Sequence, residues 1–183
     1  MDIEKTLAEN KTVLIVLPSS DYHDILADVT KKLSKKNVCY VTLNKTFYAL
    51  TEQFKKKKVK LENMVFIDAI SKTIKKSEDQ TESCYFVSSP GALTELSIVI
   101  SKFIGHGFDY LIFDSITNLL TYRKPNVVEK FVCNLINKVK ASKTKGIFLA
   151  LNIKEQEALI KKASMFVDAV IEISGERSSQ LRL

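Results

Sequence analysis

The chain has 183 residues, is 45% hydrophobic and 27% charged, and carries a formal net charge of +7. This length and composition predict one globular domain, residues 1–183, with a sizeable core, and they exclude a disordered chain. No apolar run reaches the roughly 18 residues that a transmembrane helix needs. The start of the chain is charged and lacks the apolar core of a secretory signal, so we expect a cytoplasmic protein.

The cysteines and histidines give no sign of a metal site. Cys39, Cys84 and Cys133 are scattered and form no Cys-x-x-Cys pair. We therefore expect buried free thiols in a reducing compartment. With two histidines and no cysteine cluster, neither a structural zinc ion nor another bound metal is expected.

Short apolar runs alternate with longer amphipathic runs along the chain. The apolar runs predict strands at 12–17, 38–43, 64–68, 84–87, 108–115, 147–151 and 169–173, with a short final strand at 180–183. The amphipathic runs predict helices that begin near residues 21, 46, 90, 125 and 155. Residues 71–82 are polar and rich in lysine, and they show no clear hydrophobic periodicity. We therefore predict that residues 71–84 form a surface excursion that could be mobile.

Two of these helices have recognisable start signals. Pro90 fits the first turn of a helix that Ser89 would cap. Pro125-Asn126-x-x-Glu129 is a capping signature ahead of the next helix. The alternation as a whole predicts βαβ units, and hence a three-layer α/β/α domain with a mainly parallel central sheet.

The most informative run is Phe108-Asp109-Tyr110-Leu111-Ile112-Phe113-Asp114-Ser115. Its four apolar residues, followed by an acid and a hydroxyl, are typical of a parallel strand that is buried on both faces. Parallel sheets bind ligands beyond the carboxyl ends of their strands. Asp114 and Ser115 are therefore candidate site residues.

The order of elements and the ending Asp114-Ser115-Ile116-Thr117-Asn118-Leu119 resemble the RecA/KaiC-like branch of P-loop ATPases over residues 11–173. The resemblance implies a RecA-like sheet with antiparallel C-terminal strands, and it makes Asp114 and Ser115 a Walker B-like pair. It also implies bound ATP and Mg²⁺, a glycine- and lysine-containing phosphate loop after the first strand, and acids after the second strand.

The chain departs from this family pattern at the phosphate loop. The segment Pro18–Ile25 contains no glycine and no lysine. The residues at the degenerate loop position are Ser19, Ser20, Asp21, His23 and Asp24. Asp21 and Asp24 are expected to cap the following helix, and their charge lies where a phosphate would otherwise bind. After the second strand, Asn44 and Lys45 replace the expected acids.

We therefore favour a non-catalytic domain that acts as a regulatory or protein-interaction module without a cofactor. Its partner could be a RecA/KaiC-like ATPase or a second copy of itself. One alternative is an atypical ATPase that uses Asp114 and Ser115 with ATP and Mg²⁺. Another is a nucleic-acid accessory protein that uses Lys55, Lys56, Lys57 and Lys58, although cations also suit a helix end. A serine hydrolase is disfavoured because the Gly-x-Ser-x-Gly motif is missing.

Overall fold

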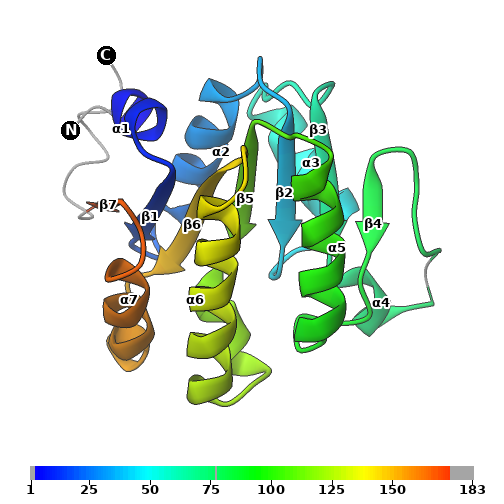
Figure 1. The fold of residues 1–183 in the computed structure, drawn as a ribbon. Helices are drawn as coiled ribbons and strands as arrows, with labels where there is room; N and C mark the ends of the chain where they lie inside the picture. Colours follow the sequence, from blue (N-terminus) through cyan, green and yellow to red (C-terminus); the bar gives the residue numbers. More distant parts are fainter. Residues whose placement is uncertain (1–2, 77, 174–183) are drawn as a thin grey trace.

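A seven-stranded parallel sheet forms the centre of the protein (Figure 1). The computed structural model describes residues 3–76 and 78–173. The strands are β1 Thr12–Leu17, β2 Val38–Thr42, β3 Met64–Asp68, β4 Cys84–Phe86, β5 Tyr110–Asp114, β6 Lys145–Leu151 and β7 Ala169–Glu172. Their order across the sheet is β4-β3-β2-β5-β6-β1-β7, and every pair of neighbours is parallel.

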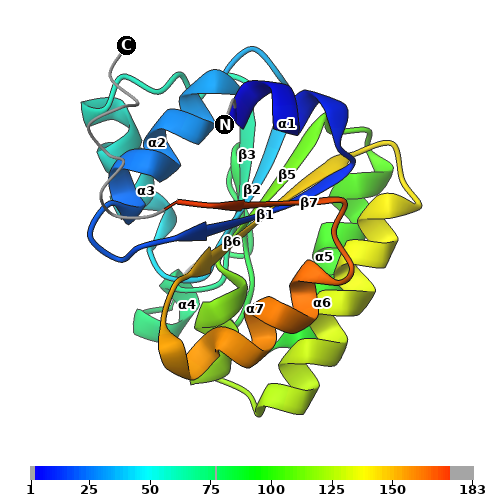
Figure 2. The ribbon, with the colours of Figure 1, turned by 90° about the vertical axis from the view of Figure 1, so that its left-hand side faces the viewer.

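Helices cover both faces of this sheet (Figure 2). One face carries α1 Ile3–Glu9, α2 Tyr22–Lys32 and α3 Phe47–Lys56, and the other carries α5 Leu93–Gly105, α6 Pro125–Lys140 and α7 Glu157–Ser164. Successive strand residues point to opposite faces, so Tyr40 packs in the first layer and Val41 in the second. The predicted three-layer α/β/α architecture is confirmed. The strand predicted at 180–183 lies outside the described residues.

One predicted helix start, that of α5, and one predicted capping signature, that of α6, are wrong. α5 begins at Leu93 after Ala92, because Pro90 and Gly91 first form a turn whose Gly91 carbonyl accepts a 2.7 Å hydrogen bond from Arg123 Nε. In α6, Pro125 occupies the first helical position after Lys124. The Asn126 side chain accepts a bond from the amide of Val127 and does not cap the helix from in front of it.

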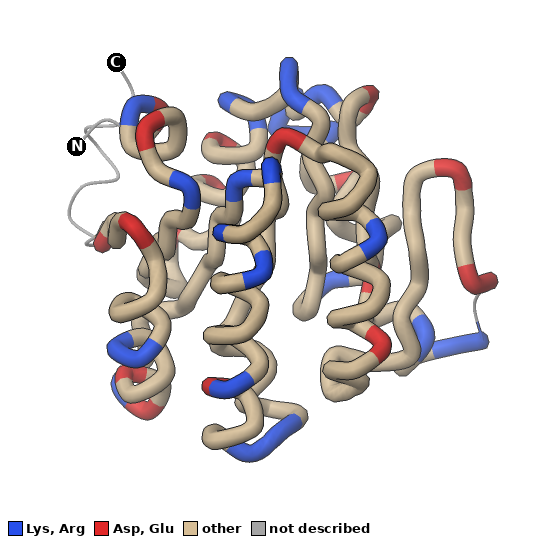
Figure 3. Tube along the Cα trace, viewed as in Figure 1, with Lys and Arg blue, Asp and Glu red and all other residues tan. Residues whose placement is uncertain are grey.

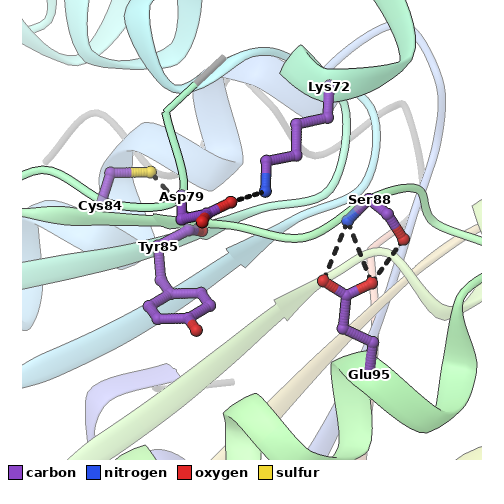
Figure 4. A network of polar contacts seen from close by, with 6 residues as sticks. All are labelled: Lys72, Asp79, Cys84, Tyr85, Ser88 and Glu95. Carbon is purple, nitrogen blue, oxygen red and sulfur yellow. Dashed lines mark hydrogen bonds and ion pairs between the residues drawn. The ribbon is translucent and has the colours of Figure 1, made fainter. Parts of the chain in front are cut away.

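The segment after β3 folds back against the edge strand β4. It contains α4 Ser71–Ile74, and Lys72 then forms a 2.6 Å ion pair with Asp79 (Figure 4). The amide of Phe86 donates to the carbonyl of Asp79, and Gln80 forms an antiparallel bridge with Tyr85. On leaving β4, the amide of Ser88 donates to Glu95 in the first turn of α5.

Cys39, Cys84 and Cys133 are all buried, as predicted. Burial raises the pKa of the Cys39 thiol far above its usual range. Among the described helices, none combines the length and the apolar character that crossing a bilayer requires.

Candidate functional site

Asp114 lies at the carboxyl edge of the sheet, at the end of the central strand β5. Its partner on the neighbouring strand β2 is Thr42, and the Asp114 side chain is fully buried. Asp114 follows Ile112 by two residues, so its side chain projects into the same layer as Tyr40, on the α2 and α3 side. The Walker B-like position is therefore inside the protein and not in an open cleft.

Both carboxylate oxygens of Asp114 already have protein donors. The Tyr40 hydroxyl donates to Oδ2 over 2.5 Å, and the Asn44 amide donates to Oδ1 over 3.1 Å. The same Asn44 amide group lies 3.4 Å from the hydroxyl of Tyr22, the first residue of α2. Asn44 thus connects the end of β5 to the start of the helix where a phosphate loop would be expected.

Burial governs the ionisation of this cluster. It raises the pKa of the Asp114 carboxyl well above its ordinary value, and it also raises the pKa of the Tyr40 hydroxyl. A raised pKa favours the neutral, protonated carboxyl, which is a weak ligand for a cation. The arrangement stabilises a buried polar contact better than it would bind Mg²⁺, which prefers several oxygen ligands together with substrate phosphates.

Ser115, the second residue of the Walker B-like pair, makes its side-chain contact with Thr117 and not with the cluster around Asp114. Its hydroxyl lies 3.1 Å from that of Thr117, and Thr117 accepts a bond from the amide of Leu151 at the end of β6. Both hydroxyls are buried. The peptide bond between Asp114 and Ser115 is cis. Ser115 and Thr117 therefore join the ends of β5 and β6.

The loop between β1 and α2 is only four residues long, from Pro18 to Asp21. Ser19 and Ser20 are exposed, and the Ser20 hydroxyl donates to the Asp21 carboxylate over 3.1 Å. Asp21 occupies the N-cap position, but its side chain makes no capping hydrogen bond to the helix. The predicted side-chain cap by Asp21 is therefore wrong. Asp24 forms a 2.5 Å ion pair with Lys57.

His23 is exposed and packs edge-on against Tyr22, with ring centroids 5.6 Å apart. Partial burial and the positive charge of Lys45 lower the pKa of His23, while Asp24 opposes them. Lys45 donates to the side-chain oxygen of Gln53, and burial lowers the pKa of Lys45 as well. The Gln53 side-chain nitrogen is buried, and no described residue accepts a hydrogen bond from it.

The structure brings together residues that the sequence did not connect. Tyr40 and Asn44 contact Asp114, and Asn44 also contacts Tyr22. Ser19 and Ser20 are exposed, and Asp24 forms an ion pair with Lys57 after α3. Lys55–Lys58 lie far along α3 and its following loop, at the opposite edge of the sheet. The alternation of side chains along β2 is the one signal that could have placed Tyr40 beside a strand-end acid.

A second buried aspartate, Asp68, ends β3 and was not predicted as a site residue. Its carboxylate accepts hydrogen bonds from the amides of Phe47, Ile70 and Ser71, at 2.6–2.8 Å, and from the Ser71 hydroxyl at 2.6 Å. These bonds tie the starts of α3 and α4 to the sheet. Across residues 3–76 and 78–173, no group of three or more His, Cys, Asp or Glu side chains is arranged to hold a metal ion.

The parallel sheet and its two helical layers define an α/β fold, and solved structures share this fold. The KaiC-like protein PH0186 from Pyrococcus horikoshii OT3 matches with a TM-score of 0.64 and 12% identity, over 92% of this chain and 74% of that protein.

A second solved structure shares the fold. The uncharacterized protein PH0321 from Pyrococcus horikoshii, solved in complex with an unknown peptide, matches with a TM-score of 0.69 and 12% identity. The match covers 93% of this chain and 82% of that protein. No protein-family model and no curated protein sequence matches the chain.

Proposed function

We propose that this chain is a non-catalytic KaiC-like domain that works as a regulatory or protein-interaction module. The observation that carries the proposal is the closed environment of Asp114. Its carboxyl is fully buried, and Tyr40 and Asn44 occupy its two oxygens. A Walker B-like carboxylate that served a metal–nucleotide complex would need an accessible oxygen, which this geometry does not provide.

The loop after β1 supports the same conclusion. A phosphate loop wraps phosphates with glycine backbone amides and neutralises them with a lysine. Residues 18–25 contain neither residue type, and Asp21 and Asp24 add negative charge at the start of α2. Anions favour a helix N-terminus, but these carboxylates already supply the negative charge there and would repel a triphosphate.

Apolar side chains at the carboxyl edge of the sheet suggest where a partner binds. We define the carboxyl-edge surface as Tyr48, Ile74, Tyr122 and Val127, which are 44–69% exposed and follow β2, β3 and β5 in the chain. Tyr48 also lines a hollow of about 210 Å³ together with Thr81 and Phe86. Exposed apolar side chains that gather at one edge are typical of protein-binding surfaces. The peptide bound to PH0321 is consistent with this role.

Isothermal titration with Mg-ATP tests the non-catalytic part of the proposal. We expect no saturable binding in the micromolar range. An ATPase assay then compares the native protein with Asp114→Asn, which keeps the size of the side chain. Equal background rates support the proposal, whereas turnover that collapses in the variant would show an atypical ATPase that uses Asp114 and Ser115.

A second copy of the chain is the first partner to test at the carboxyl-edge surface. Sedimentation of the native protein should show self-association that Ile74→Ser with Tyr122→Ser abolishes. The matched control, Ile98→Ser with Met165→Ser, removes two exposed apolar side chains from other parts of the surface and should associate like the native protein. A monomer at every concentration would exclude a second copy as the partner.

A further inference from the structure

The amino edge of the sheet, opposite the Asp114 cluster, carries most of the positive charge of the molecule. We define this basic edge as the segments that lead from the last helical turn into five neighbouring strands: 9–11, 31–37, 55–63, 102–109 and 138–145. They hold fifteen lysines, no arginine and three acids. The chain has 28 basic and 21 acidic residues, so the remainder has 13 basic against 18 acidic residues. The protein is therefore strongly polarised.

Backbone hydrogen bonds place these segments side by side. The amide of Gly146 donates to Lys11, that of Lys145 to Asp109, and that of Asp109 to Asn37, each over 2.9 Å. One strand further on, Val38 donates to Asn63. With about 4.8 Å between strands, the basic edge is about 19 Å wide from β1 to β3. Figure 3 shows several blue segments along this upper edge, where the strands begin.

Most of these lysines form no salt bridge with another described residue. Four of the fifteen lysines form salt bridges among the described residues. Of the acids at this edge, Asp109 already accepts a bond from the amide of Asn37. Partial burial, and after it the nearby positive charge of Lys145, lower the pKa of Lys11.

Five exposed lysines of the basic edge are best placed to contact a polyanion: Lys35, Lys36, Lys58, Lys60 and Lys143. They lie beyond the last residues of α2, α3 and α6, where the effect of a helix dipole on a charge falls away. The structure shows no salt bridge for any of them within residues 3–76 and 78–173. Their charge is therefore available to a polyanion.

The chemistry of the basic edge favours one kind of polyanion. None of the six exposed large apolar side chains of the described residues lies in these segments, whereas membrane-binding surfaces combine basic and apolar groups. Proteins that bind single strands stack bases on exposed aromatic rings, and no Phe, Tyr or Trp side chain of the basic edge is exposed. Lysines alone recognise phosphates as point charges. We propose that the basic edge binds the phosphate backbone of a nucleic-acid duplex without sequence preference.

Fluorescence anisotropy with a short labelled DNA duplex tests this proposal. The native protein should bind at low salt, with an affinity that falls steeply as salt rises. The test variant replaces Lys35, Lys36, Lys58, Lys60 and Lys143 with glutamine. Each lysine that contacts a phosphate should reduce the slope of log affinity against log salt by about 1. We expect the variant to lose at least about tenfold in affinity at low salt.

A control variant separates the basic edge from net charge alone. It replaces five exposed lysines elsewhere, Lys76, Lys124, Lys130, Lys154 and Lys161, with glutamine. The proposal requires the control to bind nearly like the native protein. Equal losses in both variants would mean that only net charge matters, and would overturn it. Absence of duplex binding at low salt, with or without binding to anionic lipid vesicles, would also overturn it.

Discussion

Asp68 and Asp114 end two strands that flank β2, and both lie opposite Thr42 in the sheet. Both are fully buried, but their donors differ. Asp68 accepts bonds from three backbone amides and one hydroxyl, at the starts of two helices. Asp114 accepts bonds from the side chains of Tyr40 and Asn44. The same strand-end residue thus anchors the backbone in one place and closes a polar cluster in the other.

The difference has a physical consequence. Removing the Asp68 carboxylate would leave backbone amide donors unsatisfied. A second substitution cannot remove these donors, because they belong to the main chain. Around Asp114 the donors are side chains, so donor and acceptor can be changed together at low cost. We therefore expect Asp68 to dominate stability, and we expect Asp114 to tolerate a neutral replacement.

The largest effect is expected from Asp68→Ala. This change leaves the buried amides of Ile70 and Ser71, and that of Phe47, without their acceptor. At about 1–3 kcal/mol for each buried unsatisfied group, the free energy of unfolding should fall by at least about 3 kcal/mol. Urea denaturation measures this loss. A loss below about 1 kcal/mol would contradict the anchoring role.

A smaller effect is expected from Tyr40→Phe. The Asp114 Oδ2 atom loses its 2.5 Å donor while the ring packing against Phe54 and Phe66 stays. The free energy of unfolding should fall by about 1–3 kcal/mol. In an Asp114→Asn background the same change should cost less, because the two residues are in contact. Tyr48→Phe, at an exposed ring, is the control and should change stability by no more than about 0.5 kcal/mol.

The smallest effect, and one of opposite sign, is expected from Asp114→Asn. The folded protein raises the pKa of Asp114 above the value of about 3.9 that applies to the unfolded chain. The native state therefore binds this proton more tightly, and its stability declines as pH rises from that value through the folded pKa. Asparagine removes the titration. Thermal unfolding should show that the stability of the variant relative to that of the native protein increases as pH rises. A stability difference that does not change with pH would contradict this prediction.

The central strands could be predicted from the sequence because apolar runs mark them directly. β1 and β3 have the predicted bounds, and β5 lies within the predicted range 108–115. The parallel arrangement followed from the alternation of strands and helices. These features depend on patterns that are local in the sequence, so they could be predicted without knowledge of the tertiary contacts.

The surroundings of Asp114 could not be predicted in the same way. Tyr40 lies on a strand and Asn44 in a loop, and only the folded sheet brings both to Asp114. Tyr22, from a helix, joins the cluster through Asn44. The start of α5 and the side-chain cap of α2 were predicted wrongly for a related reason. A long-range bond from Arg123 to Gly91 accompanies the turn that precedes α5, and Asp21 occupies its predicted position without making the predicted bond.

The fold-back beside β4 has a consequence for self-assembly of the sheet. Edge strands expose unpaired backbone groups that can recruit strands from other chains. Here the amide of Phe86 donates to Asp79, and that of Thr81 to the carbonyl of Cys84, so the chain itself occupies the outer side of β4. The antiparallel bridge between Gln80 and Tyr85 adds to this cover. At the β4 edge, the protein is therefore protected against the repeated addition of strands from other chains that leads to amyloid.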